Sequence, residues 1–214
     1  MSRIISSSQQ KYLDAFDRKK DMLLKNIEEF AEENNIPILS KLSANLLDQL
    51  IVMNKPQRVL EIGTAIGYST IRIARRLGRK AVIHTIEKSA PNIAIAKENF
   101  KKAGLENKIK LLEGDALRLM PQLQKKYDFI FLDADKEDYK RLFDYSMVLL
   151  KKGGVIFVDN LLWHGYVAAN KVPPKYKKST SLIRDFNRIF MTQPSLSSTI
   201  LPVGDGVGIG VKIL

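Results

Sequence analysis

Acidic and amide side chains follow the apolar runs of this chain, at the points where strands are expected to end. Glu61 closes one run, Glu87 the next and Asp133 a later one, while Asp159 and Asn160 together close a fourth. The carboxyl ends of parallel strands share one edge of a sheet, and ligands bind beyond that edge. Because isolated buried carboxylates are unfavourable, this accumulation predicts a functional site there.

Asp133, Asp159 and Asn160 are a candidate metal-ligand set. If the strands before them are neighbours, their ends lie roughly 5 Å apart. Two carboxylates and one amide oxygen suit Mg²⁺ or Mn²⁺, with water or substrate oxygens completing the shell. Lys136 follows Asp133 by three residues and is expected to face the same space, so the group could deprotonate a hydroxyl. The alternative for Lys136 is a solvated lysine at a helix start.

A glycine turn near Gly63 and Gly67 separates a β-type run from a helical pattern. This is the opening unit of a nucleotide-binding α/β domain. The Gly-x-x-x-Gly spacing departs from the dinucleotide fingerprint, and Glu61 suits a positively charged ligand better than a pyrophosphate. A sulfonium cofactor with an amino group is such a ligand, and Glu87 is placed to bind ribose hydroxyls. The alternatives are a plain tight turn and, for Asp115, a helix N-cap.

Helical spacing and apolar runs predict the elements that position these residues. Predicted helices cover residues 9–34, 40–54, 67–78, 90–103, 137–150 and 179–191. Predicted strands cover residues 57–62, 81–86, 108–112, 127–132 and 155–158, the last after a Gly153–Gly154 turn. Residues 161–178 are expected to form a long loop, and 198–203 with 207–213 an antiparallel hairpin. The alternation predicts an α/β fold with a mostly parallel sheet and helices on both faces.

Composition excludes several classes of protein. The 214 residues contain no Cys and two His, which rules out disulfides and a multi-histidine metal site. No apolar run is long enough to span a bilayer, so we expect a cytoplasmic protein without a membrane partner. The net charge of +12 favours polyanionic partners, although lysines scattered over a solvated surface explain it equally well. An apolar stripe along residues 9–34 predicts core packing or a homodimer interface.

Three motifs resemble one enzyme family. The segments 61–69, 132–136 and 159–165, together with 201–206, are similar to the metal-dependent O-methyltransferases that act on catechols and caffeoyl-CoA. Within that family, residues 36–38 and 61–69 most resemble the bacterial tRNA 5-hydroxyuridine methyltransferases. The resemblance implies a Rossmann-like class I methyltransferase fold with a seven-stranded sheet. It also implies S-adenosylmethionine as methyl donor, with Mg²⁺ or Mn²⁺ as the metal.

The resemblance also assigns site residues. The implied cofactor-binding residues are Ile38, Glu61, Gly63, Thr64, Ser69, Glu87, Asp115, Ala116 and Asp133. The implied metal ligands are Asp133, Asp159 and Asn160, and the implied catalytic residues are Lys136 and Asp133. We expect one domain over residues 1–214, with N-terminal helices at 1–54, a cofactor-binding core at 55–160 and an acceptor side at 161–214.

The expected acceptor is 5-hydroxyuridine in a tRNA anticodon loop, with a small catechol or hydroxycinnamoyl compound as the alternative. Lys171, Lys175, Lys177 and Lys178 are expected to overhang the metal site and contact phosphates, or to form a solvated loop. Two other hypotheses stay open at this point. They are an RNA-binding protein that has kept the fold and a nicotinamide dehydrogenase, against which the glycine spacing argues.

Overall fold

A seven-stranded sheet forms the centre of the computed structural model, which describes residues 7–16 and 21–214. Its strands are β1 (Arg58–Ile62), β2 (Val82–Glu87), β3 (Ile109–Glu113), β4 (Tyr127–Leu132), β5 (Leu150–Val158), β6 (Leu196–Leu201) and β7 (Val207–Lys212). They lie in the order β3-β2-β1-β4-β5-β7-β6. Strands β1 to β5 pair in parallel, while β7 runs antiparallel to both β5 and β6. The predicted fold class is confirmed.

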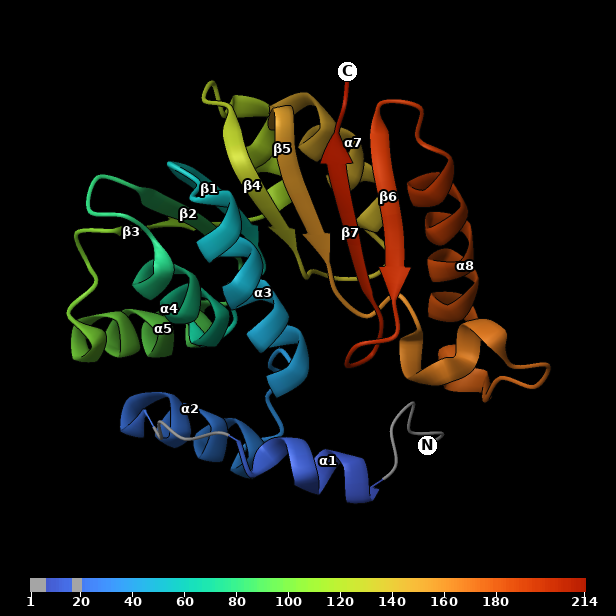
Figure 1. Cartoon of the computed structure of the whole chain (residues 1–214), viewed down its shortest axis with the longest axis horizontal. Helices are drawn as coiled ribbons and strands as arrows, with labels where there is room; N and C mark the ends of the chain where they lie inside the picture. Colours follow the sequence, from blue (N-terminus) through green and yellow to red (C-terminus); the bar gives the residue numbers. More distant parts are fainter. Residues whose placement is uncertain (1–6, 17–20) are drawn as a thin grey trace.

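Helices cover both faces of the sheet (Figure 1). The helices of the described residues are α1 (Ser7–Asp14), which lies away from the sheet in Figure 1, α2 (Met22–Glu33), α3 (Lys41–Asn54), α4 (Tyr68–Arg76), α5 (Ala90–Ala103), α6 (Ala116–Leu119), α7 (Tyr139–Leu149) and α8 (Lys177–Thr192). Side chains alternate along each strand, so Phe129 and Phe131 of β4 pack with α2 to α5. Ile130 and Leu132 pack with α7 and α8 on the other face. This double cover buries the central strands β1 and β4 and leaves the carboxyl ends of the parallel strands as the place for a site.

The N-terminal region is not the single long helix predicted over 9–34. Helix α1 ends at Asp14, and α2 begins at Met22 after the N-cap Asp21. The Asp21 carboxylate accepts hydrogen bonds from the backbone N–H groups of Leu23 and Leu24, which sets a helix start that the apolar spacing concealed. Residues 17–20, in the middle of the predicted helix, lie outside the described residues. Ile27 packs in the core, whereas Tyr12 of α1 and Phe16, two residues beyond the end of α1, are exposed, so a homodimer interface there stays a prediction.

Two other boundaries differ from the prediction. Strand β5 begins at Leu150 rather than after Gly154, because it pairs with β4 at Tyr127 and again from Val155. The intervening residues, with Gly153 at φ +76°, bulge from the ladder. The predicted loop 161–178 contains two 3₁₀ turns, η2 (Trp163–Ala168) and η3 (Pro174–Tyr176), and α8 begins at 177. A further 3₁₀ turn, η1 (Met120–Gln122), follows α6.

Among the described residues, no helix is long and apolar enough to cross a membrane.

Candidate active site

A cavity of about 1000 Å³ opens at the carboxyl ends of the parallel strands. Its walls come from the turns after β1, β2, β3, β4 and β5, with the segment before α3 and the start of η2 closing two sides. Of the predicted site residues, the cavity lining contains Ile38, Gly63, Thr64, Ser69, Glu87, Asp115, Ala116, Asp133, Lys136, Asp159 and Asn160. The sheet thus gathers into one cavity residues that are up to 122 positions apart, as 160 − 38 gives. Glu61 is the predicted site residue absent from this lining.

The glycine turn brings two strand ends into close contact. Gly63 has φ +103°, and a Cβ on it would lie 1.8 Å from the backbone oxygen of Asp133. Gly67, at φ +87°, faces the ring of Phe100, which a Cβ would approach to 2.5 Å. Both positions therefore require glycine for conformation and for space. The turn also delivers the N-terminus of α4 to the cavity, where Ser69 lies.

Glu61 lies beneath the cavity floor rather than in it. Its side chain is fully buried and accepts hydrogen bonds from the hydroxyls of Ser69 (2.6 Å), Thr85 (2.5 Å) and Thr70. Burial raises the pKa of Glu61 from its ordinary value of 4.5 to about 7, against the opposite effect of the three hydroxyls. Thr64 completes this layer through a 2.6 Å hydrogen bond to Thr85. Contact between Glu61 and a charged ligand stays a prediction.

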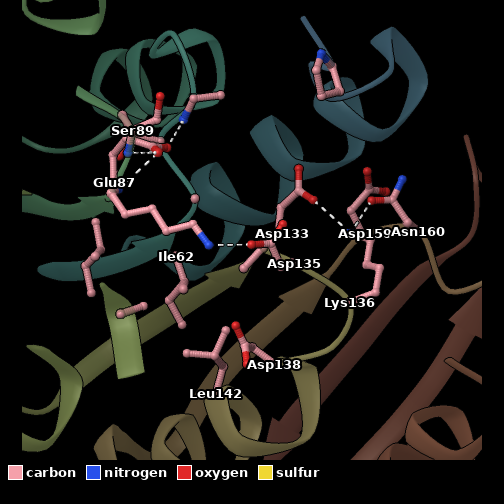
Figure 2. Close-up of a pocket in the computed structure, with 18 of the residues that line it drawn as sticks. Ile62, Glu87, Ser89, Asp133, Asp135, Lys136, Asp138, Leu142, Asp159 and Asn160 are labelled. Carbon is pink, nitrogen blue, oxygen red and sulfur yellow. Dashed lines mark hydrogen bonds and ion pairs between the residues drawn. The ribbon is translucent and has the colours of Figure 1, made fainter. Parts of the chain in front are cut away.

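Glu87 lies at the end of the cavity that is opposite to Lys136 (Figure 2). Its carboxylate accepts hydrogen bonds from the backbone N–H groups of Ala65 (2.8 Å), Lys88 (3.0 Å) and Ser89 (2.8 Å). These bonds fix the acid at the end of β2 beside the glycine turn, which suits recognition of two neighbouring hydroxyls. Asp115 caps α6 by accepting a 2.7 Å bond from the N–H of Leu117. Asp115 thus serves as the helix cap foreseen among the alternatives, while still lining the cavity.

Lys136 is the centre of the polar group at the other end of the cavity. Its ammonium donates to Asn160 Oδ1 (2.7 Å), to the Tyr139 hydroxyl (2.5 Å) and to Asp133 Oδ1 (3.3 Å). The Tyr139 hydroxyl in turn donates to the backbone oxygen of Asp159 at 3.1 Å. Figure 2 shows Asp133, Asp159 and Asn160 gathered around Lys136. The expected neighbourhood of β4 and β5 is confirmed by their pairing, and it produces this convergence.

Asp159 is the most constrained acid of the group. It is 4% exposed, and its Oδ1 atom is buried without a hydrogen-bond partner among the described residues. Burial, followed by the charge of Asp133, raises the pKa of Asp159 to about 8. An orphaned buried oxygen is unfavourable, and a hard cation would satisfy it. Because Asp133, Asp159 and Asn160 offer only oxygen donors, the residues present fit Mg²⁺ or Mn²⁺.

Aromatic side chains stand beside this polar group. Trp163 and His164 line the cavity, with ring centroids 5.1 Å apart. Tyr176 packs 5.5 Å from His164 and 5.0 Å from Tyr166. The Trp163 indole N–H donates to Ser179 Oγ at 2.9 Å, which ties the η2 turn to α8. The arrangement provides a partly apolar aromatic wall next to Lys136, whose ammonium lies 5.7 Å from the Trp163 ring centroid, and such a wall can receive an aromatic ring.

No role was predicted from the sequence for two residues that hold other parts of the site in place, Tyr139 and Arg184. Tyr139 lies three positions after Lys136, a spacing that could have suggested contact on one helical turn. Arg184 gave no signal in the sequence, yet its guanidinium donates to the backbone oxygens of Tyr166, Val167 and Ala169. It thereby holds the η2 segment in place.

Comparison with known proteins places the chain in a family. The model of the O-methyltransferase family matches residues 15–213. The chain belongs to this family. It is 35% identical to caffeoyl-CoA O-methyltransferase of Medicago sativa over 193 residues, covering 84% of this chain and 76% of that protein. As a member of the family, the chain is an O-methyltransferase, which confirms the predicted class of enzyme.

Solved structures agree with this assignment. A Staphylococcus aureus chain, 34% identical, superposes with a TM-score of 0.90 and covers 96% of this chain and 99% of its own length. The O-methyltransferase of Bacillus cereus, solved with S-adenosylhomocysteine, is 29% identical with a TM-score of 0.85, covering 96% and 97% of the two chains. TomG of Streptomyces achromogenes, solved with S-adenosylmethionine, is 25% identical with a TM-score of 0.87 and full coverage of both chains.

Proposed function

We propose that the chain transfers a methyl group from S-adenosylmethionine to one hydroxyl of a small catechol-type acceptor, with Mg²⁺ or Mn²⁺ as cofactor. The observation that carries the proposal is the convergence of Lys136 with three oxygen donors beside an aromatic wall. Two family members of similar architecture were solved with the donor or its demethylated product. The curated relatives include caffeoyl-CoA O-methyltransferases, whose named acceptor is phenolic.

The donor fits the end of the cavity between the glycine turn and Glu87. In the proposal, Glu87 binds the ribose hydroxyls and Asp115 with Ala116 borders the adenine, as their positions in the lining allow. Ile38, Gly63, Thr64 and Ser69 line the part nearer Asp133, where the methionine portion would lie. Calorimetry should show binding of S-adenosylmethionine and of its demethylated product, weakened in Glu87→Ala. Binding of NAD without binding of either sulfur compound would contradict the proposal.

The metal would be held by Asp133, Asp159 and Asn160. A divalent cation held there supplies positive charge that favours the ionised form of a neighbouring acceptor hydroxyl. Lys136 directs its ammonium at the same place, so it can donate a hydrogen bond to the acceptor oxygen as negative charge develops. Trp163 and His164 would orient the ring, and alignment of oxygen, carbon and sulfur supplies part of the rate enhancement.

The charge of the cavity favours a small acceptor over RNA. Seven carboxylates line the cavity, namely Glu87, Asp115, Asp133, Asp135, Glu137, Asp138 and Asp159, against two lysines, Lys88 and Lys136. Part of the positive charge lies at the opposite edge of the sheet. Lysine side chains occur there near the amino ends of the strands, namely Lys80 before β2, Lys110 in β3 and Lys126 before β4. The net charge of +12 is therefore weak support for RNA at the active site.

Methylation of 5-hydroxyuridine in tRNA remains the second candidate, because exposed lysines occur near the cavity rim. Lys175, Lys177 and Lys178 are exposed at η3 and the start of α8, and Lys178 forms a 2.7 Å ion pair with the cavity residue Glu137. Phosphates flanking a splayed-out uridine could contact these lysines. The aromatic wall could receive the base by stacking.

One assay separates the two acceptors. Labelled S-adenosylmethionine is incubated with the chain and either a vicinal diphenol or tRNA from cells lacking the chain. We expect label in the diphenol and a turnover unaffected by changing Lys175, Lys177 and Lys178 to Ala. Efficient tRNA labelling that the triple variant reduces, with a flatter salt dependence, would reverse the order of the candidates. Absence of label in both acceptors would contradict the proposed reaction.

A further inference from the structure

The turn between β6 and β7 packs tightly against the loop that follows β5. The N–H of Leu161 donates to Gly206 O (2.9 Å), and the N–H of Leu162 donates to Asp205 O (2.8 Å). A Cβ on Gly206 would lie 2.4 Å from Leu162 Cγ, so the contact depends on glycine. The turn therefore touches the segment that begins with Asp159 and Asn160, although it comes about forty-five positions later, as 205 − 160 gives.

Asp205 holds this loop in an unfavourable backbone conformation. Three non-glycine residues of the loop have positive φ angles: Asn160 (62°), Trp163 (46°) and His164 (56°). Such left-handed conformations are unfavourable for residues other than glycine and persist where surrounding contacts impose them. The Asp205 carboxylate imposes one of them directly, because its Oδ1 atom accepts a 2.6 Å hydrogen bond from the His164 N–H.

The same carboxylate lies close enough to the Asn160 side chain for that side chain to lower its pKa. Asn160 Oδ1 accepts the 2.7 Å hydrogen bond from Lys136, so its amide nitrogen must point away from Lys136. Burial raises the pKa of Asp205, and hydrogen bonding from the His164 backbone and the Asn160 side chain acts in the opposite direction. Asp205 Oδ2 is buried without a hydrogen-bond partner among the described residues. A carboxylate accepts only, so it attracts the nitrogen end of the amide and repels the oxygen end.

We propose that Asp205 is a positioning residue of the cation site. It fixes the left-handed loop over residues 160–165 and turns the Asn160 amide so that oxygen, rather than nitrogen, faces the cation. The inference rests on the proposed metal dependence, since an amide nitrogen cannot serve as a ligand for Mg²⁺. Residues that orient metal ligands typically change metal affinity by 10- to 100-fold when replaced.

Two substitutions separate the interaction of Asp205 with the His164 N–H from its interaction with the Asn160 amide. Asp205→Asn keeps an acceptor for the His164 N–H but presents an amide to Asn160, which removes the preference for one orientation. Asp205→Ala removes both interactions. The matched control is Asp185→Asn, the same chemical change in an exposed ion pair with Arg188 on α8.

The metal readout is titration of Mn²⁺ by electron paramagnetic resonance, without donor or acceptor. We expect Mn²⁺ affinity to fall about tenfold in Asp205→Asn and further in Asp205→Ala, within the range typical of such residues. Asp185→Asn should match the unmodified chain. Binding of S-adenosylhomocysteine and the melting temperature should stay close to those of the unmodified chain in Asp205→Asn.

The loop readout is independent of the metal. Trp163 is the only tryptophan of the chain, so acrylamide quenching of its fluorescence reports the loop conformation. Quenching should rise in Asp205→Ala and stay near the original in Asp205→Asn. Unchanged quenching in Asp205→Ala, or an Mn²⁺ affinity within twofold in Asp205→Asn, would overturn the proposal.

Failure of the proposed function gives a different pattern. If the unmodified chain binds no Mn²⁺, the metal dependence is wrong and the role of Asp205 in orienting a metal ligand falls with it. Increased quenching in Asp205→Ala would then still support the loop-holding part. A fall in melting temperature and in S-adenosylhomocysteine binding, to the same degree as Mn²⁺ binding, would show a general folding role and contradict positioning.

Discussion

Replacing Glu61 by Gln should change how stability depends on pH. Glu61 is fully buried, and burial raises its pKa from 4.5 to about 7. Between these values the folded chain keeps a proton that the unfolded chain has released. Stability therefore falls as pH rises through this window and levels off above about pH 7. At 1.36 kcal/mol per pKa unit, the loss amounts to about 3 kcal/mol.

Comparing Glu61→Gln with the unmodified chain isolates the contribution of Glu61 to the pH dependence of stability. Asp159, with its pKa near 8, contributes a slope of the same sign in both proteins and cancels on subtraction. Glu61→Gln has no proton to lose, so its stability relative to the original chain should rise by about 3 kcal/mol from pH 4.5 to pH 8. The assay is urea unfolding at several pH values, with exposed Glu98→Gln as the control that should follow the original chain. Parallel curves for Glu61→Gln and the original would refute the reasoning.

Three further changes have defined outcomes. Tyr139→Phe removes one acceptor of the Lys136 ammonium and should lower kcat about tenfold, the value of one hydrogen bond, with S-adenosylhomocysteine binding unchanged by calorimetry. Gly63→Ala places a methyl group 1.8 Å from a backbone oxygen and should destabilise the chain by at least about 2 kcal/mol in urea unfolding, whereas Gly78→Ala, with open space around it, should not. Because Asp159 has a pKa of about 8, Mn²⁺ affinity should rise nearly tenfold per pH unit between pH 6 and 7; a flat profile would contradict this.

The sequence contained the information for the position of the site because parallel strands impose it. Once β1, β2, β4 and β5 are recognised as apolar runs, the acids that follow them must meet at one edge. The proximity of Asp133 and Asp159 could therefore be predicted from the sequence. The direction in which the Glu61 side chain points could not be predicted. It depends on which face of β1 carries the residue and on the hydroxyls of Thr70 and Thr85, whose positions are set by the packing of α4 and β2.

The roles of Asp205 and Arg184 could not be predicted from the sequence because they depend on contacts between distant segments. Insertion of β7 between β5 and β6 brings Asp205 to the loop after β5, and no local pattern encodes that pairing. The contact of Arg184 with three carbonyl groups depends on how α8 lies against η2. The helix boundary at Asp21 had a local signal, an N-cap residue, which the apolar spacing of residues 9–34 obscured.

One measurement tests metal-dependent methyl transfer to a catechol-type hydroxyl most directly. Labelled S-adenosylmethionine is incubated with a vicinal diphenol and the chain, with Mg²⁺ or after exhaustive chelation, and Asp159→Ala is assayed beside it. We expect a singly methylated product with Mg²⁺, almost none after chelation and almost none from Asp159→Ala, which should still bind S-adenosylhomocysteine. Full methylation after chelation, or full activity of Asp159→Ala, would contradict the claim.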